Sequence, residues 1–164
     1  MTLVQPAATE SGDPRRMWIP KTHPAVYKAL VALQRASSAD LDPTLGELIK
    51  IRASQLNGCA YCLHMHTKDS IELGVDPLKL GLIAAWEEST GVFTDVERAV
   101  LGLTDAITRI SDAGVPDEVF DAAAAILDTQ TLGQVVASIA MINTWNRIAI
   151  AGNYPTGLDE RSLR

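Results

Sequence analysis

Hydrophobic side chains recur at helical spacing along most of the chain that follows residue 20. In the first such stretch, Val26, Leu30 and Leu33 are separated by three or four positions, which is typical of one face of an α-helix. No stretch between turn signals shows the strict alternation that indicates a strand. The pattern therefore predicts an all-α protein, a single-domain bundle of about seven helices with short connections.

Capping residues, prolines and glycines mark where these helices should begin and end. Asp42 and Asp76 each stand before a proline, as an N-cap followed by proline at the first helical position would. Thr94 and Glu97 have the spacing of a capping box, and Gly74 suits the end of a helix. We expect helices over residues 24–38, 42–55, 59–74, 76–90, 94–114, 116–127 and 131–151.

The domain organisation follows from length and composition. The chain has 164 residues, which suits one domain with its own core. Residues 1–20 are rich in proline, small polar and charged residues, and predict an N-terminal tail. Residues 21–154 should form the helical domain, and residues 155–164 a C-terminal tail. No internal repeat or change of composition marks a second domain.

The last predicted helix is unusually apolar. Its segment VVASIAMINTWNRIAIAG carries a single charge, on Arg147. A helix that is apolar all round must be buried all round, either as a central core helix or partly in a subunit interface. The polar run of Trp145, Asn146 and Arg147 should form a buried hydrogen-bonded cluster, or place Trp145 or Arg147 in the wall of a substrate pocket.

Composition and charge exclude several classes of protein. Apolar residues make up 47% of the chain and charged residues 21%, which argues against intrinsic disorder. The net charge of −6 and the lack of a basic face argue against a nucleic-acid binder. No apolar run is long enough for a membrane span or follows the tail as a signal-peptide core. We therefore expect a cytoplasmic protein that binds neither nucleic acid nor membranes.

The two cysteines of the chain, Cys59 and Cys62, both fall in the stretch ELIKIRASQLNGCAYCLHMHTKD. In a reducing compartment a structural disulfide is not expected. Redox chemistry, metal binding and two inert core thiols are the remaining interpretations of this Cys-x-x-Cys pair.

The spacing of the neighbouring residues favours redox chemistry. Cysteines three residues apart at the start of a helix lie one turn apart, within range of a disulfide. The helix N-terminus favours a thiolate, most directly at Cys59. His66 follows Cys62 by four residues on the same helical face and can act as a base, while Glu47 on the preceding helix is a candidate to orient the imidazole.

A metal site is a weaker interpretation of the same residues. Cys59, Cys62 and His66 could supply three ligands, with Glu47 or His64 as the fourth. Structural zinc sites usually have four cysteine or histidine ligands, often in two separated pairs. The chain has no second pair, so the sequence favours a site without metal.

The spacing of these site residues resembles the signature of the AhpD-like alkylhydroperoxidases, in the carboxymuconolactone decarboxylase superfamily. The order is Glu47, eleven residues, Cys59-Ala-Tyr-Cys62, three residues and His66. The segments NGCAYCLHMHTKDS, HPAVYKAL and INTWNRIAIAG are also similar to members of this group. The resemblance implies an all-helical homotrimer or homohexamer. It also implies an antioxidant peroxidase that reduces organic hydroperoxides or hydrogen peroxide without haem, flavin, metal or other cofactor.

The resemblance also implies a role for each site residue. Cys62 would attack the peroxide and become a sulfenic acid, and Cys59 would resolve it by forming the Cys59–Cys62 disulfide. His66 and Glu47 would form the proton relay. A dithiol donor, a lipoyl-bearing protein in well-known members, would then reduce the disulfide.

Two features of the chain qualify this expectation. Helix position favours Cys59 as the more acidic thiol, whereas the resemblance and the spacing to His66 favour attack by Cys62. Well-studied members also carry a second histidine where this chain has Tyr61, whose hydroxyl does not take up protons near neutral pH, so we expect a slower peroxidase. The alternatives are a redox-sensing or metal-binding helical oligomer and a general disulfide reductase without peroxide specificity.

Overall fold

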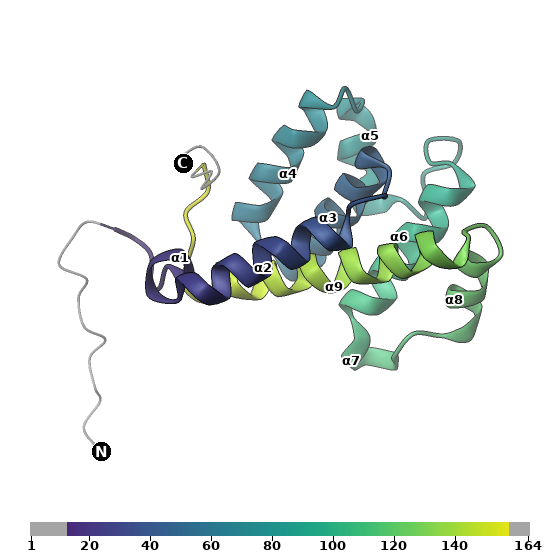
Figure 1. Cartoon of the computed structure of the whole chain (residues 1–164). Helices are drawn as coiled ribbons and strands as arrows, with labels where there is room; N and C mark the ends of the chain where they lie inside the picture. The colour runs from purple at the N-terminus through teal and green to yellow at the C-terminus, as the bar shows by residue number, and fades with distance from the viewer. Residues whose placement is uncertain (1–12, 158–164) are drawn as a thin grey trace, which may run out of the picture.

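The computed structural model describes residues 13–157, and these residues form an all-helical domain (Figure 1). The prediction of an all-α protein is confirmed. Residues 1–12 and 158–164, which make up much of both predicted tails, lie outside the described residues. The elements in chain order are α1 (Ile19–Thr22), α2 (Pro24–Ser37), α3 (Pro43–Asn57), α4 (Ala60–Glu72), α5 (Pro77–Leu82), the 3₁₀ helix η1 (Ile83–Ala85), α6 (Asp95–Thr108), α7 (Ile110–Ala113), α8 (Asp117–Ala124) and α9 (Thr129–Gly152).

Side-chain caps mark the starts of α3, α6 and α9. The carboxylate of Asp42 accepts the Leu45 N–H at 2.9 Å at the start of α3, and Thr94 forms the predicted capping box at the start of α6. α9 begins at Thr129, two residues before the predicted start, because Asp128 accepts the Thr131 N–H and caps the helix.

The predicted helix over residues 76–90 is too long. α5 ends at Leu82 and is followed by η1. Beyond it, the guanidinium of Arg98 on α6 donates to the backbone carbonyls of Trp86, Glu87 and Ser89. These carbonyls therefore accept hydrogen bonds from a side chain of another helix, beyond the end of η1.

The predicted helix over residues 94–114 is interrupted at Arg109. The backbone of Arg109 has φ −99° and ψ 33°, outside the α-helical region, and separates α6 from α7. The buried hydroxyl of Thr108, the last residue of α6, accepts a hydrogen bond from Asn143 on α9 at 3.0 Å. Together with the short helix α1, this break makes the helices more numerous than predicted.

α3 lies at the centre of the domain and packs against α4, α6 and α9 (Figure 1). Its apolar side chains Leu48 and Ile49 are fully buried. Arg52 on the same helix forms a bidentate salt bridge with the carboxylate of Asp105 on α6, with N···O distances of 2.5 and 2.6 Å. The charged contact and the apolar core together fix α3, which carries Glu47 of the site, against its neighbours.

α9 is buried along one side only. Its residues Ile139, Ile142 and Asn146 are buried in the core, whereas Ala140 and Ile150 on other faces are exposed. The expectation of a core helix is confirmed, and the expectation of burial all round is wrong for a single chain. α2 lies along α9 (Figure 1).

The start and the end of the described chain meet. The backbone N–H groups of Arg16 and Met17 both donate to the carbonyl of Gly152, and the Ile19 N–H donates to the hydroxyl of Tyr154 at 3.1 Å. A side chain at Gly152 would approach Tyr154 to 2.5 Å, so this contact requires glycine. Among the described helices, none combines the length and apolar character needed to cross a bilayer.

Candidate active site

The two cysteine sulfurs lie side by side at the start of α4. Gly58 ends α3 with φ 69°, and Cys59 is the N-cap of the next helix. The Cys59 N–H donates to the Ser54 carbonyl at 2.9 Å, and the Cys59 sulfur accepts the Cys62 N–H at 3.4 Å. The sulfurs are 2.6 Å apart, and both residues are buried. The predicted close approach of the two sulfurs is confirmed.

The two thiols differ in acidity. A hydrogen bond from Cys62 to the Cys59 sulfur outweighs the effect of burial and lowers the pKa of Cys59. The same hydrogen bond, burial and the neighbouring charge raise the pKa of Cys62. When the pair loses one proton, the negative charge therefore lies on Cys59, as the helix position predicts.

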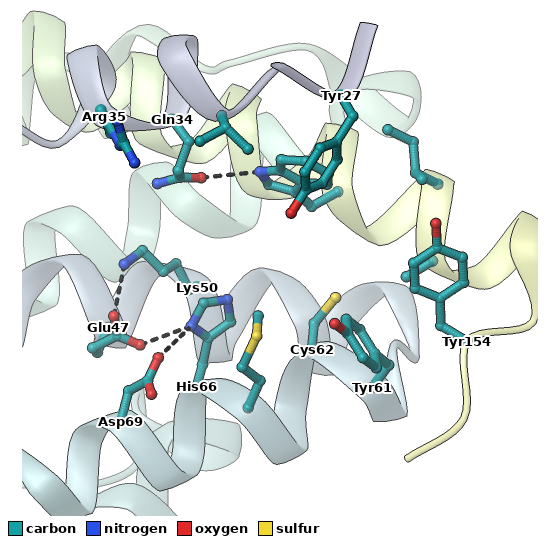
Figure 2. Close-up of a pocket in the computed structure, with 15 residues that line it drawn as sticks. Tyr27, Gln34, Arg35, Glu47, Lys50, Tyr61, Cys62, His66, Asp69 and Tyr154 are labelled. Atoms are coloured by element: carbon teal, nitrogen blue, oxygen red, sulfur yellow. Dashed lines mark hydrogen bonds and ion pairs between the residues drawn. The ribbon is translucent and has the colours of Figure 1, made fainter. Parts of the chain in front are cut away.

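Glu47, Lys50 and His66 form a charged group beside the dithiol (Figure 2). His66 Nδ1 lies 2.9 Å from Glu47 Oε2, and the Lys50 ammonium donates to Glu47 Oε1 at 2.6 Å. With Nδ1–H donating to the carboxylate, Nε2 is the acceptor nitrogen, and it faces the cavity described below. Asp69 Oδ2 lies farther from Nδ1, at 3.7 Å.

The ionised state of Glu47 is favoured in this setting. Burial alone would raise the pKa of Glu47, but the hydrogen bond from His66 and the charge of the Lys50 ammonium help to lower it below its ordinary value of 4.5. The predicted contact between Glu47 and His66 is therefore present, and it orients the imidazole.

The lowered pKa of Glu47 makes a prediction about stability. Because the pKa of Glu47 is lower in the folded state, its contribution to stability is complete above about pH 4.5 and is lost as the pH falls through the folded-state value. We expect Glu47→Gln to be less stable than the wild type at pH 7, with a difference that shrinks below about pH 4.5. Urea unfolding across this range measures it, and a difference independent of pH would contradict it.

A cavity of about 440 Å³ joins the charged group to the dithiol (Figure 2). Arg35, Glu47, Lys50, His66 and Asp69 line one part of it, and apolar and aromatic side chains line the rest. The lining residues come from α2, α3, α4, α9 and the segment after α9: Tyr27, Val31, Gln34, Arg35, Glu47, Lys50, Tyr61, Cys62, Met65, His66, Asp69, Trp145, Ile148, Ala149 and Tyr154.

Cys62 reaches this cavity, whereas Cys59 is not among the residues that line it. The Cys62 sulfur points into the space that His66 also faces (Figure 2). Within residues 13–157, no hydrogen bond joins the His66 ring to either sulfur, so the direct contact that the spacing suggested is absent. In this arrangement a molecule in the cavity would carry a proton between Cys62 and His66.

The four-ligand metal site is not assembled among the described residues. The ligand atoms that lie within 4.8 Å of one another belong to Glu47, His66 and Asp69, and neither cysteine is part of this group. His64 is exposed on a different face of α4. Lys50 already occupies one oxygen of Glu47, which further disfavours a cation there.

The wall of the cavity that α2 and α9 form was not predicted from the sequence, apart from Trp145. The indole N–H of Trp145 donates to Gln34 Oε1 at 3.1 Å, and its ring meets that of Tyr27 edge to face at 6.0 Å. Tyr61 and Tyr154 form a similar ring pair at 5.4 Å. α2 offers no sequence signal for this role, but the spacing of Lys50 to Glu47 and of Asp69 to His66 could have identified both charged neighbours.

Both expectations for the polar run on α9 hold in part. Trp145 lines the cavity, whereas Asn146 is fully buried in a hydrogen-bonded cluster. Arg147 is exposed and donates to the Asn143 carbonyl and side-chain oxygens at 2.9 Å.

Comparison with known proteins places the chain in a family. Residues 24–106 match the model of the carboxymuconolactone decarboxylase family. YdfG of Bacillus subtilis strain 168, an uncharacterised protein, is 36% identical over 129 residues, covering 78% of this chain and 87% of YdfG. A protein of unknown function from Agrobacterium tumefaciens, provisionally assigned to antioxidant defence as AhpD, is 36% identical with a TM-score of 0.84, over 88% of this chain and 99% of that one.

A more distant structure has the same fold. The debrominase Bmp8, crystallised with 2,3,4-tribromopyrrole, is 21% identical with a TM-score of 0.72, over 87% of this chain and 76% of its own. At this identity the likeness concerns the fold alone. The matched family model, the relatives over most of their length and the shared helical fold show that this chain belongs to the carboxymuconolactone decarboxylase family and has an AhpD-like structure.

Proposed function

We propose that the protein is a thiol-dependent peroxidase that reduces organic hydroperoxides, and hydrogen peroxide, through a Cys59–Cys62 thiol/disulfide cycle. One observation carries the proposal: a buried pair of sulfurs 2.6 Å apart opens, at Cys62, onto a cavity that it shares with an imidazole bound to Glu47. This arrangement provides a nucleophile, a resolving thiol and a base in one site.

The first step is attack by Cys62. A water or the substrate in the cavity carries the Cys62 proton to His66 Nε2, and Glu47 stabilises the charge that the imidazole gains. This step puts the negative charge on Cys62, the less acidic thiol, because Cys62 is the sulfur that lines the cavity. The Cys62 thiolate attacks the terminal oxygen of the hydroperoxide, an S–O bond forms and the O–O bond breaks. The leaving alkoxide takes the proton from His66, so the products are an alcohol and a sulfenic acid on Cys62.

The second step closes the disulfide. The Cys59 sulfur attacks the Cys62 sulfur, the S–O bond breaks, and the proton of Cys59 leaves with the hydroxide as water. The sum is one dithiol and one hydroperoxide giving one disulfide, one alcohol and one water. A dithiol donor, such as the lipoyl group implied by the family resemblance, then returns the pair to its reduced form in the cytoplasm.

The size and the lining of the cavity support an organic substrate. A volume of about 440 Å³ is far larger than hydrogen peroxide requires, and Tyr27, Tyr61, Trp145 and Tyr154 supply aromatic walls. An alkyl or aryl group can lie against these rings while its hydroperoxide meets Cys62. The walls would also accept a halogenated ring such as the tribromopyrrole bound by Bmp8.

Analysis of the products distinguishes peroxide reduction from dehalogenation and from reaction with disulfides alone. The reduced protein is mixed with equimolar cumene hydroperoxide or with 2,3,4-tribromopyrrole. We expect cumyl alcohol and an oxidised Cys59–Cys62 pair in the first mixture, and no bromide release in the second. Bromide release without peroxide reduction would indicate a dehalogenase, and reaction with disulfides alone would indicate a disulfide reductase or a redox sensor.

We also propose that the protein forms a homotrimer or homohexamer. Ser37 is the buried residue of α2, while Val26 and Leu33 on the same helix are 47% and 56% exposed. An assembly that covers these side chains would remove apolar surface from water. Light scattering of the purified protein tests it, and a monomer at micromolar concentration would contradict it.

A further inference from the structure

Two hydrogen-bond donors on α2 line the charged end of the cavity and have no part in the chemistry above. Arg35 is exposed there, and no hydrogen bond or ion pair joins its guanidinium to another side chain within residues 13–157. The oxygen of the Gln34 amide accepts the Trp145 N–H, so the amide nitrogen, Nε2, is left to donate elsewhere. Figure 2 shows this nitrogen and the Arg35 guanidinium on one wall of the cavity, on the side that Lys50 faces.

The acidic side chains at this end of the cavity leave Arg35 without a counterion. Glu47 has both carboxylate oxygens in use, Oε1 with the Lys50 ammonium and Oε2 with His66. Asp69 lies on the opposite wall, on α4, where its carboxylate is 3.7 Å from His66 Nδ1 (Figure 2). Among the described residues that line the cavity, Arg35 is therefore the cation whose charge no carboxylate offsets, and the space that it faces favours an anion.

The chemistry of these donors indicates a carboxylate. A guanidinium presents its N–H groups in a planar fork that matches the two oxygens of a carboxylate, and the neighbouring amide can add a further hydrogen bond. The same cavity reaches Cys62, and much of its remaining lining is apolar: Val31, Met65, Trp145 and Ile148. A molecule with an anionic head and an apolar body would fill both parts.

We propose that Arg35 and Gln34 bind a carboxylate of the substrate, and that the substrates are hydroperoxides of carboxylic acids with an apolar chain. The carboxylate lies at the α2 wall while the hydroperoxide meets Cys62. The inference deepens the proposed function and rests on it for the peroxide step, but the side chains that define the carboxylate site take no part in that step.

The hydroperoxide of linoleic acid and its methyl ester test the inference, because the ester lacks the negative charge. Both are supplied to the reduced protein below the concentrations at which they form micelles. In Arg35→Met, which keeps an apolar stem, we expect the ratio of kcat/KM for the acid to kcat/KM for the ester to fall about tenfold, through a higher KM for the acid. A ratio equal to that of the wild type would overturn the inference.

Lys28→Met is the matched control. Lys28 also belongs to α2 and is exposed, but it does not line the cavity, so its replacement removes the same charge from the same helix. We expect this variant to keep the ratio of the wild type within twofold. An equal fall in both variants would mean that the general charge of the helix attracts the acid from a distance, which would also overturn the inference.

Binding of an unreactive analogue separates the inference from the proposed function. The hydroxy acid formed when linoleic acid hydroperoxide is reduced keeps the carboxylate and has no peroxide, and titration calorimetry measures its Kd. We expect this Kd to be about tenfold higher in Arg35→Met than in Lys28→Met. Such a difference without peroxide reduction would contradict the peroxidase and support the carboxylate site. Peroxide reduction with equal Kd values would support the peroxidase and contradict the carboxylate site.

Discussion

Cys62→Ser should abolish peroxide reduction. The Cys62 sulfur is the one that faces the cavity, so its replacement leaves a substrate with no accessible nucleophile even though Cys59 is the more acidic thiol. We expect consumption of cumene hydroperoxide to fall to the rate of the buffer, measured with excess dithiothreitol as the reductant. Retention of the thermal stability of the wild type would show that the loss is chemical.

Cys59→Ser is the matched control for this prediction. Cys59 raises the pKa of Cys62 through its hydrogen bond and its charge, so its removal should make Cys62 easier to ionise. The variant should react with one equivalent of peroxide and stop at a sulfenic acid on Cys62, which dimedone traps. A dimedone adduct on Cys59 in Cys62→Ser, or full turnover of that variant, would reverse the two roles.

His66→Ala should slow the reaction by a factor between about a hundred and ten thousand, the range of general acid–base catalysis. Removing the imidazole takes away the nitrogen that faces the cavity and that we assign to take the Cys62 proton and return it to the alkoxide. The rate of thiol loss after mixing with cumene hydroperoxide measures this effect.

His64→Ala provides the comparison on the same helix. His64 is exposed, lies on another face of α4 and does not line the cavity, so its removal should change the rate less than twofold. If His66→Ala and His64→Ala react at similar rates, His66 is a structural partner of Glu47 and not a proton carrier.

The separation of acidity and access explains the conflict between two sequence arguments. Helix position favoured Cys59, and the spacing to His66 favoured Cys62. In the structure the hydrogen bond from the Cys62 thiol, aided by the Cys62 backbone N–H at the N-cap, makes Cys59 the better anion. Cys62 is nevertheless the sulfur that points into the cavity. Each argument was sound for one property, and sequence alone could not show that the two properties fall on different residues.

Most helix boundaries could be predicted because their causes are local. Asp42, Asp76 and Thr94 act on backbone N–H groups within three residues, so their effect can be read from neighbouring positions. The early end of α5 could not be read in this way. The turn that follows η1 is held by Arg98, which binds carbonyls nine to twelve residues away in the sequence and belongs to a different helix.

The candidate site likewise combines contacts between neighbouring positions, which the sequence predicts, with contacts between distant positions, which it does not. The pairing of Cys59 with Cys62 follows from one helical turn, and the contact of Glu47 with His66 follows from two helices joined by a tight turn at Gly58. The other wall of the cavity comes from α2 and α9, through contacts that join residues more than a hundred positions apart, such as Gln34 and Trp145. Those contacts depend on how the helices pack, and no local pattern encodes them.

The most direct test of the central claim is the rate at which the reduced wild-type protein loses its thiols when mixed with cumene hydroperoxide in a stopped-flow instrument. We expect both thiols to disappear together, far faster than the thiol of free cysteine at the same pH, with one alcohol formed per disulfide. Thiol loss no faster than that of free cysteine would contradict a peroxidase and leave the dithiol to a different chemistry.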